Sequence, residues 1–252
     1  MRLSEKECVE LYHRYNNPNM RRWTDEEYNR LAEEYPKIKN HIERQRLAER
    51  TKRLLHQFLH CLFEAYTTVE NDGSFAMQRV GNTLYLWFQC SDGLTDWVNN
   101  FNFPAKPYRH MSDLWFCHRG FLKVWKSIEP YVSTPINDPT ITRIEIVGYS
   151  HGAAVAALCY EYVKYNRPDV NVSGVGFGGP RVLWGFAGKR VLDRFKDFVL
   201  VRNGRDIVTH LPPAVFGFRH VGKIVKIGSK SKGLIDDHRP ENYIESMEEY
   251  HV

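Results

Sequence analysis

The amino-acid sequence predicts an α/β fold, in which a mostly parallel sheet has helices on both faces, together with an N-terminal helical extension. β-rich runs alternate with helix-prone segments through most of the chain, which favours parallel strands joined by crossover helices. The first 66 residues contain no such strands and have helical signals alone. At 252 residues the chain is long enough to bury a substantial core.

The N-terminal extension is predicted to span residues 1–66. Ser4 and Thr24 can each cap a helix, because a glutamate follows three positions later in both cases. Pro36 can open the next helix. One apolar face of that helix should dock on the rest of the protein, and its residues are Leu55, Leu59, Leu62 and Tyr66. The run ERQRLAERTKR mixes acidic with basic residues, so we expect a solvated helix face and not a nucleic-acid site.

Residues 67–252 are predicted to form the α/β domain. FAMQRVGNTLYLWFQ has the pattern of a β-hairpin that turns at Gly81-Asn82. Further strands are expected in TRIEIVGY, NVSGVGFG, DFVLVR and HVGKIVKIG. Helices are expected at about 119–132, 151–166 and 181–194, and in PENYIESMEEY, where Pro240 would take the first position.

Composition excludes several functional classes. The net charge of +5 comes from mixed charges, which argues against a polyanionic partner. Five cysteines without a CxxC pair suggest buried thiols in a reducing compartment. The N-terminus lacks the apolar segment of a signal peptide and no run of eighteen apolar residues occurs, so we expect a cytoplasmic protein without a transmembrane segment. His110 and His118 do not have zinc-ligand spacing and no phosphate-binding loop is evident, so neither metal nor cofactor is expected.

The segment IEIVGYSHGAAVA contains the strongest functional signal. Its Gly148-x-Ser150-x-Gly152 pattern lies between a β-branched run and an alanine-rich helix. In a nucleophile elbow, glycines at these positions let strand and helix approach closely, and the serine occupies a strained turn. The helix dipole would favour negative charge developing beside Ser150. The alternative is a packing turn with a bystander serine.

A serine nucleophile needs a base, and the base needs an orienting carboxylate. In α/β-hydrolases these residues follow the serine in the order acid, then histidine. Asp206 follows the strand DFVLVR, and His238 lies in the polar loop DDHRP before the last helix. We therefore expect a triad of Ser150, Asp206 and His238, and we expect His251 at the chain end to contribute little. His151 would supply one oxyanion N–H, and Ser91 after the hairpin could supply the second donor.

Several segments also occur in a familiar order: TLYLWFQCSDGLTDWVNNFNF, CHRGFLKVW, IVGYSHGAAVA, FGGPRV and NGRDIVTHLPP, followed by GFRHVGKIVKIG and DHRPENY. Together they resemble the class 3 (fungal-type) lipases of the α/β-hydrolase superfamily, in an intracellular bacterial or phage-like variant. The resemblance covers about residues 75 to 245. It implies a Ser150-Asp206-His238 triad, an oxyanion hole of Ser91 and His151, and a structural role for His118.

The resemblance further implies hydrolysis of acyl esters or lipids through an acyl-enzyme, with transient contact with a lipid interface. It makes DGLTDWVNN a lid whose Leu94, Trp97 and Val98 face acyl chains, although Trp97 and Val98 could also pack into the core. Gln89-Cys90 replaces the usual Arg-Gly before the oxyanion residue, and Thr209 replaces a proline. The short run from Asp206 to His238 suggests a trimmed acyl pocket. An esterase, thioesterase or phospholipase therefore stays open, as does a non-catalytic scaffold.

Overall fold

The computed structural model describes residues 36–90, 105–108, 115–185, 189–229 and 231–249. Within these ranges a seven-stranded sheet has the order β1-β2-β3-β6-β7-β9-β11. The strands are β1 (Thr67–Thr68), β2 (Gly73–Val80), β3 (Thr83–Cys90), β6 (Arg143–Tyr149), β7 (Asn171–Phe177), β9 (Phe198–Asn203) and β11 (Lys223–Ile227). From β3 to β11 every neighbouring pair is parallel, whereas β1, β2 and β3 pair antiparallel. The predicted hairpin and the mostly parallel sheet are therefore confirmed.

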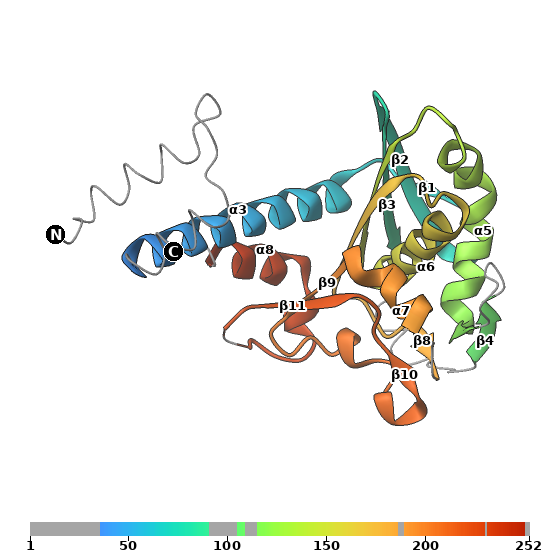
Figure 1. Cartoon of the computed structure of the whole chain (residues 1–252). Helices are drawn as coiled ribbons and strands as arrows, with labels where there is room; N and C mark the ends of the chain where they lie inside the picture. The colour runs from blue at the N-terminus through green and yellow to red at the C-terminus, as the bar shows by residue number, and fades with distance from the viewer. Residues whose placement is uncertain (1–35, 91–104, 109–114, 186–188, 230, 250–252) are drawn as a thin grey trace.

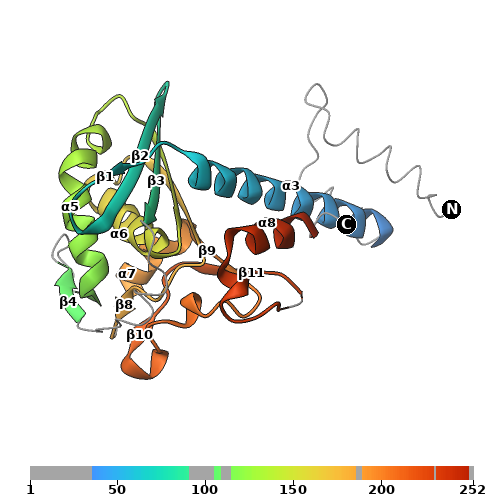
Figure 2. The ribbon, with the colours of Figure 1, turned by 180° about the vertical axis from the view of Figure 1, so that it is seen from behind.

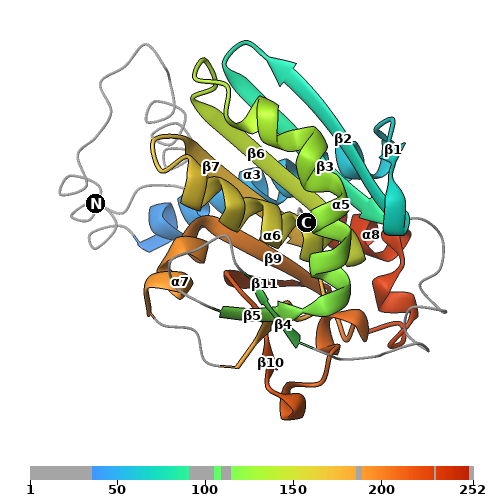
Figure 3. The same ribbon diagram turned by 90° about the vertical axis from the view of Figure 1, so that its right-hand side faces the viewer.

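Helices cover both faces of this sheet (Figures 1 and 2). α5 (Arg119–Ile136) and α6 (His151–Asn166) lie on one face, which Figure 3 shows towards the viewer. α3 (Pro36–Phe63) and α8 (Pro240–Glu249) pack side by side on the other face. Pro36 and Pro240 each occupy the first position of their helix, as predicted. No helix in the described part of the chain is long and apolar enough to cross a membrane.

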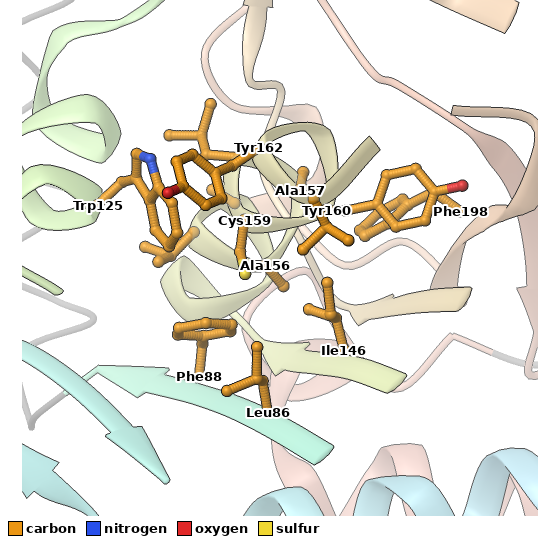
Figure 4. Close-up of a cluster of buried hydrophobic side chains, with 14 of the residues drawn as sticks. Leu86, Phe88, Trp125, Ile146, Ala156, Ala157, Cys159, Tyr160, Tyr162 and Phe198 are labelled. Carbon is orange, nitrogen blue, oxygen red and sulfur yellow. The ribbon is translucent and has the colours of Figure 1, made fainter. Parts of the chain in front are cut away.

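The core under α6 explains why this helix is rich in alanine. Leu86, Phe88 and Ile146 of the sheet point towards Ala156 and neighbouring side chains of α6 (Figure 4). Each large apolar side chain buried here contributes about 1.5–3 kcal/mol to folding. Small side chains on α6 let its axis approach the sheet. Because α6 directly follows β6, its N-terminus lies at the carboxyl ends of the parallel strands.

The core on the opposite face shows how α3 docks. Leu54, Phe58 and Cys61 are buried against the sheet and α8. Of the predicted docking face, Leu55, Leu62 and Tyr66 pack against this core and are partly buried, so the helix docks as expected. The most deeply buried side chains are Leu54, Phe58 and Cys61, which were not predicted as part of this face.

A second, antiparallel sheet covers the end of the α5–α6 layer, and the sequence did not predict it. Its order is β10-β8-β5-β4, with bounds β4 (Ala105–Tyr108), β5 (Trp115–His118), β8 (Leu183–Trp184) and β10 (Phe218–Arg219). The helix predicted at 181–194 is wrong in its first half. Leu183 is buried and Trp184 exposed, as in a strand, and Gly185 takes a positive φ of 76°. Among the described residues of that range, the helix is confined to α7 (Lys189–Arg194).

Short 3-10 turns link these elements, and the last of them carries a predicted site residue. The turns are η1 (Glu70–Asp72), η2 (Phe195–Asp197), η3 (Val208–His210), η4 (Ala214–Phe216) and η5 (Asp236–His238).

Candidate active site

Ser150 lies in the turn between β6 and α6. Its φ of 57° and ψ of −127° place it in the left-handed half of conformational space, which is costly for a residue with a side chain. Strain of this kind costs about 1–3 kcal/mol and persists only where the surroundings enforce it. The Ser150 N–H donates to the Phe177 carbonyl of β7 at 2.8 Å, which helps to fix the turn.

The two glycines of the turn are required by close packing. A Cβ on Gly152 would lie 2.1 Å from the carbonyl oxygen of Phe88 in β3. A Cβ on Gly148 would lie 2.3 Å from the carbonyl oxygen of Gly152. Real Cβ atoms do not approach backbone so closely, so larger residues at these positions would push α6 off the sheet. Packing of strand and helix explains the glycines, and the conformation of Ser150 completes a nucleophile elbow.

The structure brings Ser150, Asp206 and His238 together. The Ser150 Oγ lies 2.9 Å from Nε2 of His238, and Nδ1 of His238 lies 2.9 Å from each carboxylate oxygen of Asp206. Asp206 is fully buried and His238 is 2% exposed. The three residues come from the β6–α6 turn, the loop after β9 and the turn η5, which all lie at the carboxyl ends of parallel strands.

The buried Asp206 carboxylate has donors on both oxygens. The Val208 N–H donates to Oδ1 at 2.9 Å, and the Tyr243 hydroxyl of α8 donates to Oδ2 at 2.6 Å. Burial, reinforced by the charge of Asp206, raises the pKa of Tyr243 well above its ordinary value, so the hydroxyl keeps its proton and donates. A buried carboxylate is stable only when it is paired and hydrogen-bonded in this way.

A second tyrosine, Tyr149, contacts His238. Its ring stacks on the imidazole with centroids 5.2 Å apart and an interplanar angle of 17°. Its hydroxyl donates to the backbone carbonyl of His238. Neither Tyr149 nor Tyr243 was predicted from the sequence. The available signals were a tyrosine directly before the nucleophile and a tyrosine on the apolar side of the last helix.

The loop that carries His238 is held by its neighbour Asp237, which is 1% exposed. The Asp237 carboxylate accepts from the Ser231 hydroxyl at 2.6 Å and from the N–H groups of Arg205 and Lys232 at 2.7 Å each. Burial alone would raise the pKa of Asp237, but these hydrogen bonds outweigh it and the pKa is lowered. The carboxylate thus ties the His238 loop to the loop that carries Asp206.

We expect Asp237→Asn to destabilise the fold by about 1–3 kcal/mol at neutral pH, because charged acceptors of several buried donors are lost. Since the folded pKa lies below the unfolded value of about 3.9, the ionised group stabilises the fold above that pH. This contribution is lost as the pH falls through the folded pKa. Urea unfolding at several pH values should therefore show the difference between the parent and the variant shrinking in acid. A constant difference would contradict this reading.

Three other histidines in the described part of the chain have hydrogen-bond partners elsewhere than Ser150. His210 Nδ1 lies 2.9 Å from the carbonyl oxygen of Asp206, and His220 Nε2 lies 2.7 Å from the carbonyl oxygen of Thr209. His220 lies between β10 and β11, not in a strand as expected. His118 caps α5 by accepting from the Gly120 N–H at 3.1 Å. His251 lies outside the described residues.

His151 is the first residue of α6, where helix geometry directs N–H groups towards the N-terminus. Burial, with the nearby His118 as a smaller contribution, lowers the pKa of the His151 imidazole to about 3. The ring is therefore neutral at working pH and packs on Phe121 with centroids 4.9 Å apart. This agrees with a role through its backbone. Ser91 of the predicted oxyanion hole and the predicted lid residues Leu94, Trp97 and Val98 lie outside the described residues.

Among the described residues, no group of three His, Cys, Asp or Glu side chains could hold a metal ion. A hollow of about 850 Å³ lies at the opposite end of the strands, between β2, β3 and the end of α5, and none of the three triad residues lines it.

The chain is similar in sequence to known lipases. Residues 85–216 match the model of the family described as Lipase (class 3). The chain is 29% identical over 135 residues to secreted mono- and diacylglycerol lipase 1 of Fusarium solani, covering 52% of this chain and 39% of the relative. It is 28% identical over 149 residues to a lipase of Rhizomucor miehei, covering 56% and 40%. The chain thus spans about two-fifths of the length of these curated relatives.

Solved structures show the same architecture. The triacylglyceride lipase of Rhizomucor miehei has a TM-score of 0.58 and 26% identity, with 65% of each chain covered. A second structure, a triacylglycerol lipase whose catalytic centre is described as a serine protease triad, has a TM-score of 0.58 and 25% identity over the same shares. The α/β-hydrolase fold predicted from the sequence is confirmed.

Proposed function

Because the chain belongs to the class 3 lipase family, we propose that it is a serine hydrolase that cleaves carboxylic esters of lipid type through an acyl-enzyme. The observation that supports this most directly is the continuous hydrogen-bonded series from Ser150 through His238 to Asp206. It lies on a strained strand–helix turn, where a serine without a function would have no reason to occupy a costly conformation.

In the proposed mechanism, His238 Nε2 takes the proton of Ser150 as Oγ attacks the ester carbonyl carbon. Asp206 accepts from Nδ1–H, fixes the tautomer and stabilises the imidazolium. The negative charge on the carbonyl oxygen is held by the His151 N–H, with Ser91 as the proposed second donor. His238 then gives its proton to the departing alcohol. Water, activated by the same imidazole, releases the acid and restores Ser150.

The proposed substrates are acyl esters, and the relatives named as mono-, di- and triacylglycerol lipases favour a lipid. We propose that Leu94, Trp97 and Val98 contact the acyl chain. The segment between Asp206 and His238 is short, which favours substrates with shorter acyl chains than those that larger relatives accept.

We propose that residues 1–66 form an extension packed on a catalytic domain of residues 67–252. A cytoplasmic location is supported by the buried free thiols of Cys61, Cys117 and Cys159.

A fluorophosphonate probe tests the nucleophile directly. We expect the parent to form one covalent adduct, which peptide mass spectrometry places on Ser150, and we expect no adduct in Ser150→Ala. A p-nitrophenyl ester series of increasing chain length, with and without an oil–water interface, then defines the substrate class. Preference for acetate without activation at the interface would indicate an esterase. Absence of labelling in a folded sample would overturn the proposal and favour a scaffold.

A further inference from the structure

α3 places one aromatic side chain directly beneath the candidate triad. Phe58 is fully buried, and its ring centroid lies 5.3 Å from that of Tyr149 and 5.6 Å from that of Tyr243. Phe177 of β7 completes the group at 4.7 Å. We call Phe58, Tyr149, Phe177 and Tyr243 the Phe58 cluster. It joins α3, β6, β7 and α8 on the sheet face opposite α6.

Each member of the Phe58 cluster other than Phe58 contacts part of the site. Tyr149 stacks on the His238 ring and donates to the His238 carbonyl. Tyr243 donates to Oδ2 of Asp206. The Phe177 carbonyl accepts the N–H of Ser150. Phe58 is therefore one side chain away from His238 and Asp206, and one residue away from the backbone of Ser150. It is the only member of the cluster that the N-terminal extension supplies.

One turn further along α3, a second contact reaches the strand beside the elbow. The Cys61 thiol lies 3.8 Å from the carbonyl oxygen of Phe88, which is the atom closest to the position of a Cβ on Gly152. Burial raises the pKa of Cys61 to about 12, so the sulfur keeps its proton and can donate weakly. The Tyr66 hydroxyl in turn donates to the Cys61 carbonyl at 2.5 Å. α3 thus contacts the end of β3 as well as the two tyrosines.

We propose that α3 is a positioning element of the candidate triad, in which Phe58 supports Tyr149 and Tyr243 and thereby sets the orientation of His238 and Asp206. This inference rests on the proposed function. It gives the N-terminal extension a part in the rate of the reaction in addition to its part in stability. Phe58 itself touches no reacting atom.

Phe58 is expected to affect the rate because the triad tolerates only small displacements of its side chains. The Ser150–His238 and His238–Asp206 hydrogen bonds are all 2.9 Å long. Tyr149 and Tyr243 can fix the positions of His238 and Asp206 only while their own rings are packed. Replacing Phe58 by alanine leaves a cavity between the two rings. The rings can move into it, and a displacement of about 1 Å at a catalytic group can cost about 100-fold in rate.

The test compares Phe58→Ala with a matched change on the same helix. Leu54 is 7% exposed, lies one turn earlier and carries no ring, so Leu54→Ala removes buried apolar volume from α3 without emptying the Phe58 cluster. For each variant we would measure Tm, and kcat and KM on the best soluble p-nitrophenyl ester of the parent.

We expect Phe58→Ala to lower kcat by about 10- to 100-fold with KM nearly unchanged, because positioning is lost and binding is kept. Leu54→Ala should lower Tm by a similar amount and keep most of its kcat. Phe58→Leu, which fills part of the cavity, should recover part of kcat. Equal kcat losses in Phe58→Ala and Leu54→Ala, or a kcat that follows Tm alone, would overturn the positioning role.

A spectroscopic measurement separates this inference from the proposed function. The proton between His238 Nδ1 and Asp206 should give a downfield proton resonance, identified by its loss in His238→Ala. We expect it to shift or broaden in Phe58→Ala and to persist in Leu54→Ala. A resonance that is identical in both would overturn the inference even if the parent hydrolyses esters. A parent that is never labelled at Ser150 would overturn the proposed function, whatever the resonance does.

Discussion

Ser150→Ala and His238→Ala are each expected to lower kcat by roughly a million-fold, and the double variant is expected to lose no more than either alone. The two side chains act as one unit, because Ser150 Oγ is a poor nucleophile unless Nε2 at 2.9 Å removes its proton. Removing either group therefore removes the whole step. Some acceleration over water should remain, since the N-terminus of α6 would still bind the developing oxyanion.

The measurement is single-turnover ester hydrolysis by the three variants, with circular dichroism to confirm folding. His251→Ala serves as the histidine control and should behave like the parent. Losses that multiply in the double variant would mean that Ser150 and His238 act in separate steps. A large loss in His251→Ala with little effect of His238→Ala would mean that the wrong histidine has been assigned as the base.

Ser150, Asp206 and His238 could be proposed from the sequence alone, and the structure brings them together, because their signals are local. Gly148 and Gly152 mark a close approach of strand and helix, and the β-branched run before them marks the strand. Asp206 and His238 each follow a strand of a parallel sheet, and the carboxyl ends of such strands meet at one edge. The hairpin turn at Gly81-Asn82 was predictable for the same reason, since two residues determine it.

Features that depend on packing between distant segments were not predictable in this way. Which side chain of α8 reaches Oδ2 of Asp206 depends on how α8 lies against α3 and the sheet. The apolar side of the last helix indicates that Tyr243 is buried, but it does not specify the partner of its hydroxyl. The docking face of α3 was predicted only in part, because its apolar stripe is wider than one row of side chains and the deeply buried Leu54, Phe58 and Cys61 lie beside the predicted row. β8 and β10 were missed because strands of two residues have no measurable alternation.

Asp206→Asn is expected to lower kcat by about 10⁴-fold while the protein stays folded. The Val208 N–H requires an acceptor at the position of Oδ1, so the asparagine oxygen should occupy it and the NH2 group should face Tyr243 and His238. The Tyr243 hydroxyl can rotate and accept. His238 can accept at Nδ1 only if its proton moves to Nε2, and Nε2 then cannot take the proton of Ser150.

Asp237→Asn is the matched control, because Asp237 is equally buried and adjacent to His238, but its carboxylate accepts from Ser231, Arg205 and Lys232 and not from the imidazole. It should lose stability and keep most of its kcat, whereas Asp206→Asn should do the reverse. Measuring kcat and urea unfolding for both variants would show these opposite effects on activity and stability. If both variants lost activity in proportion to stability, Asp206 would have a structural role only, and the reaction would require a different account of how His238 is oriented.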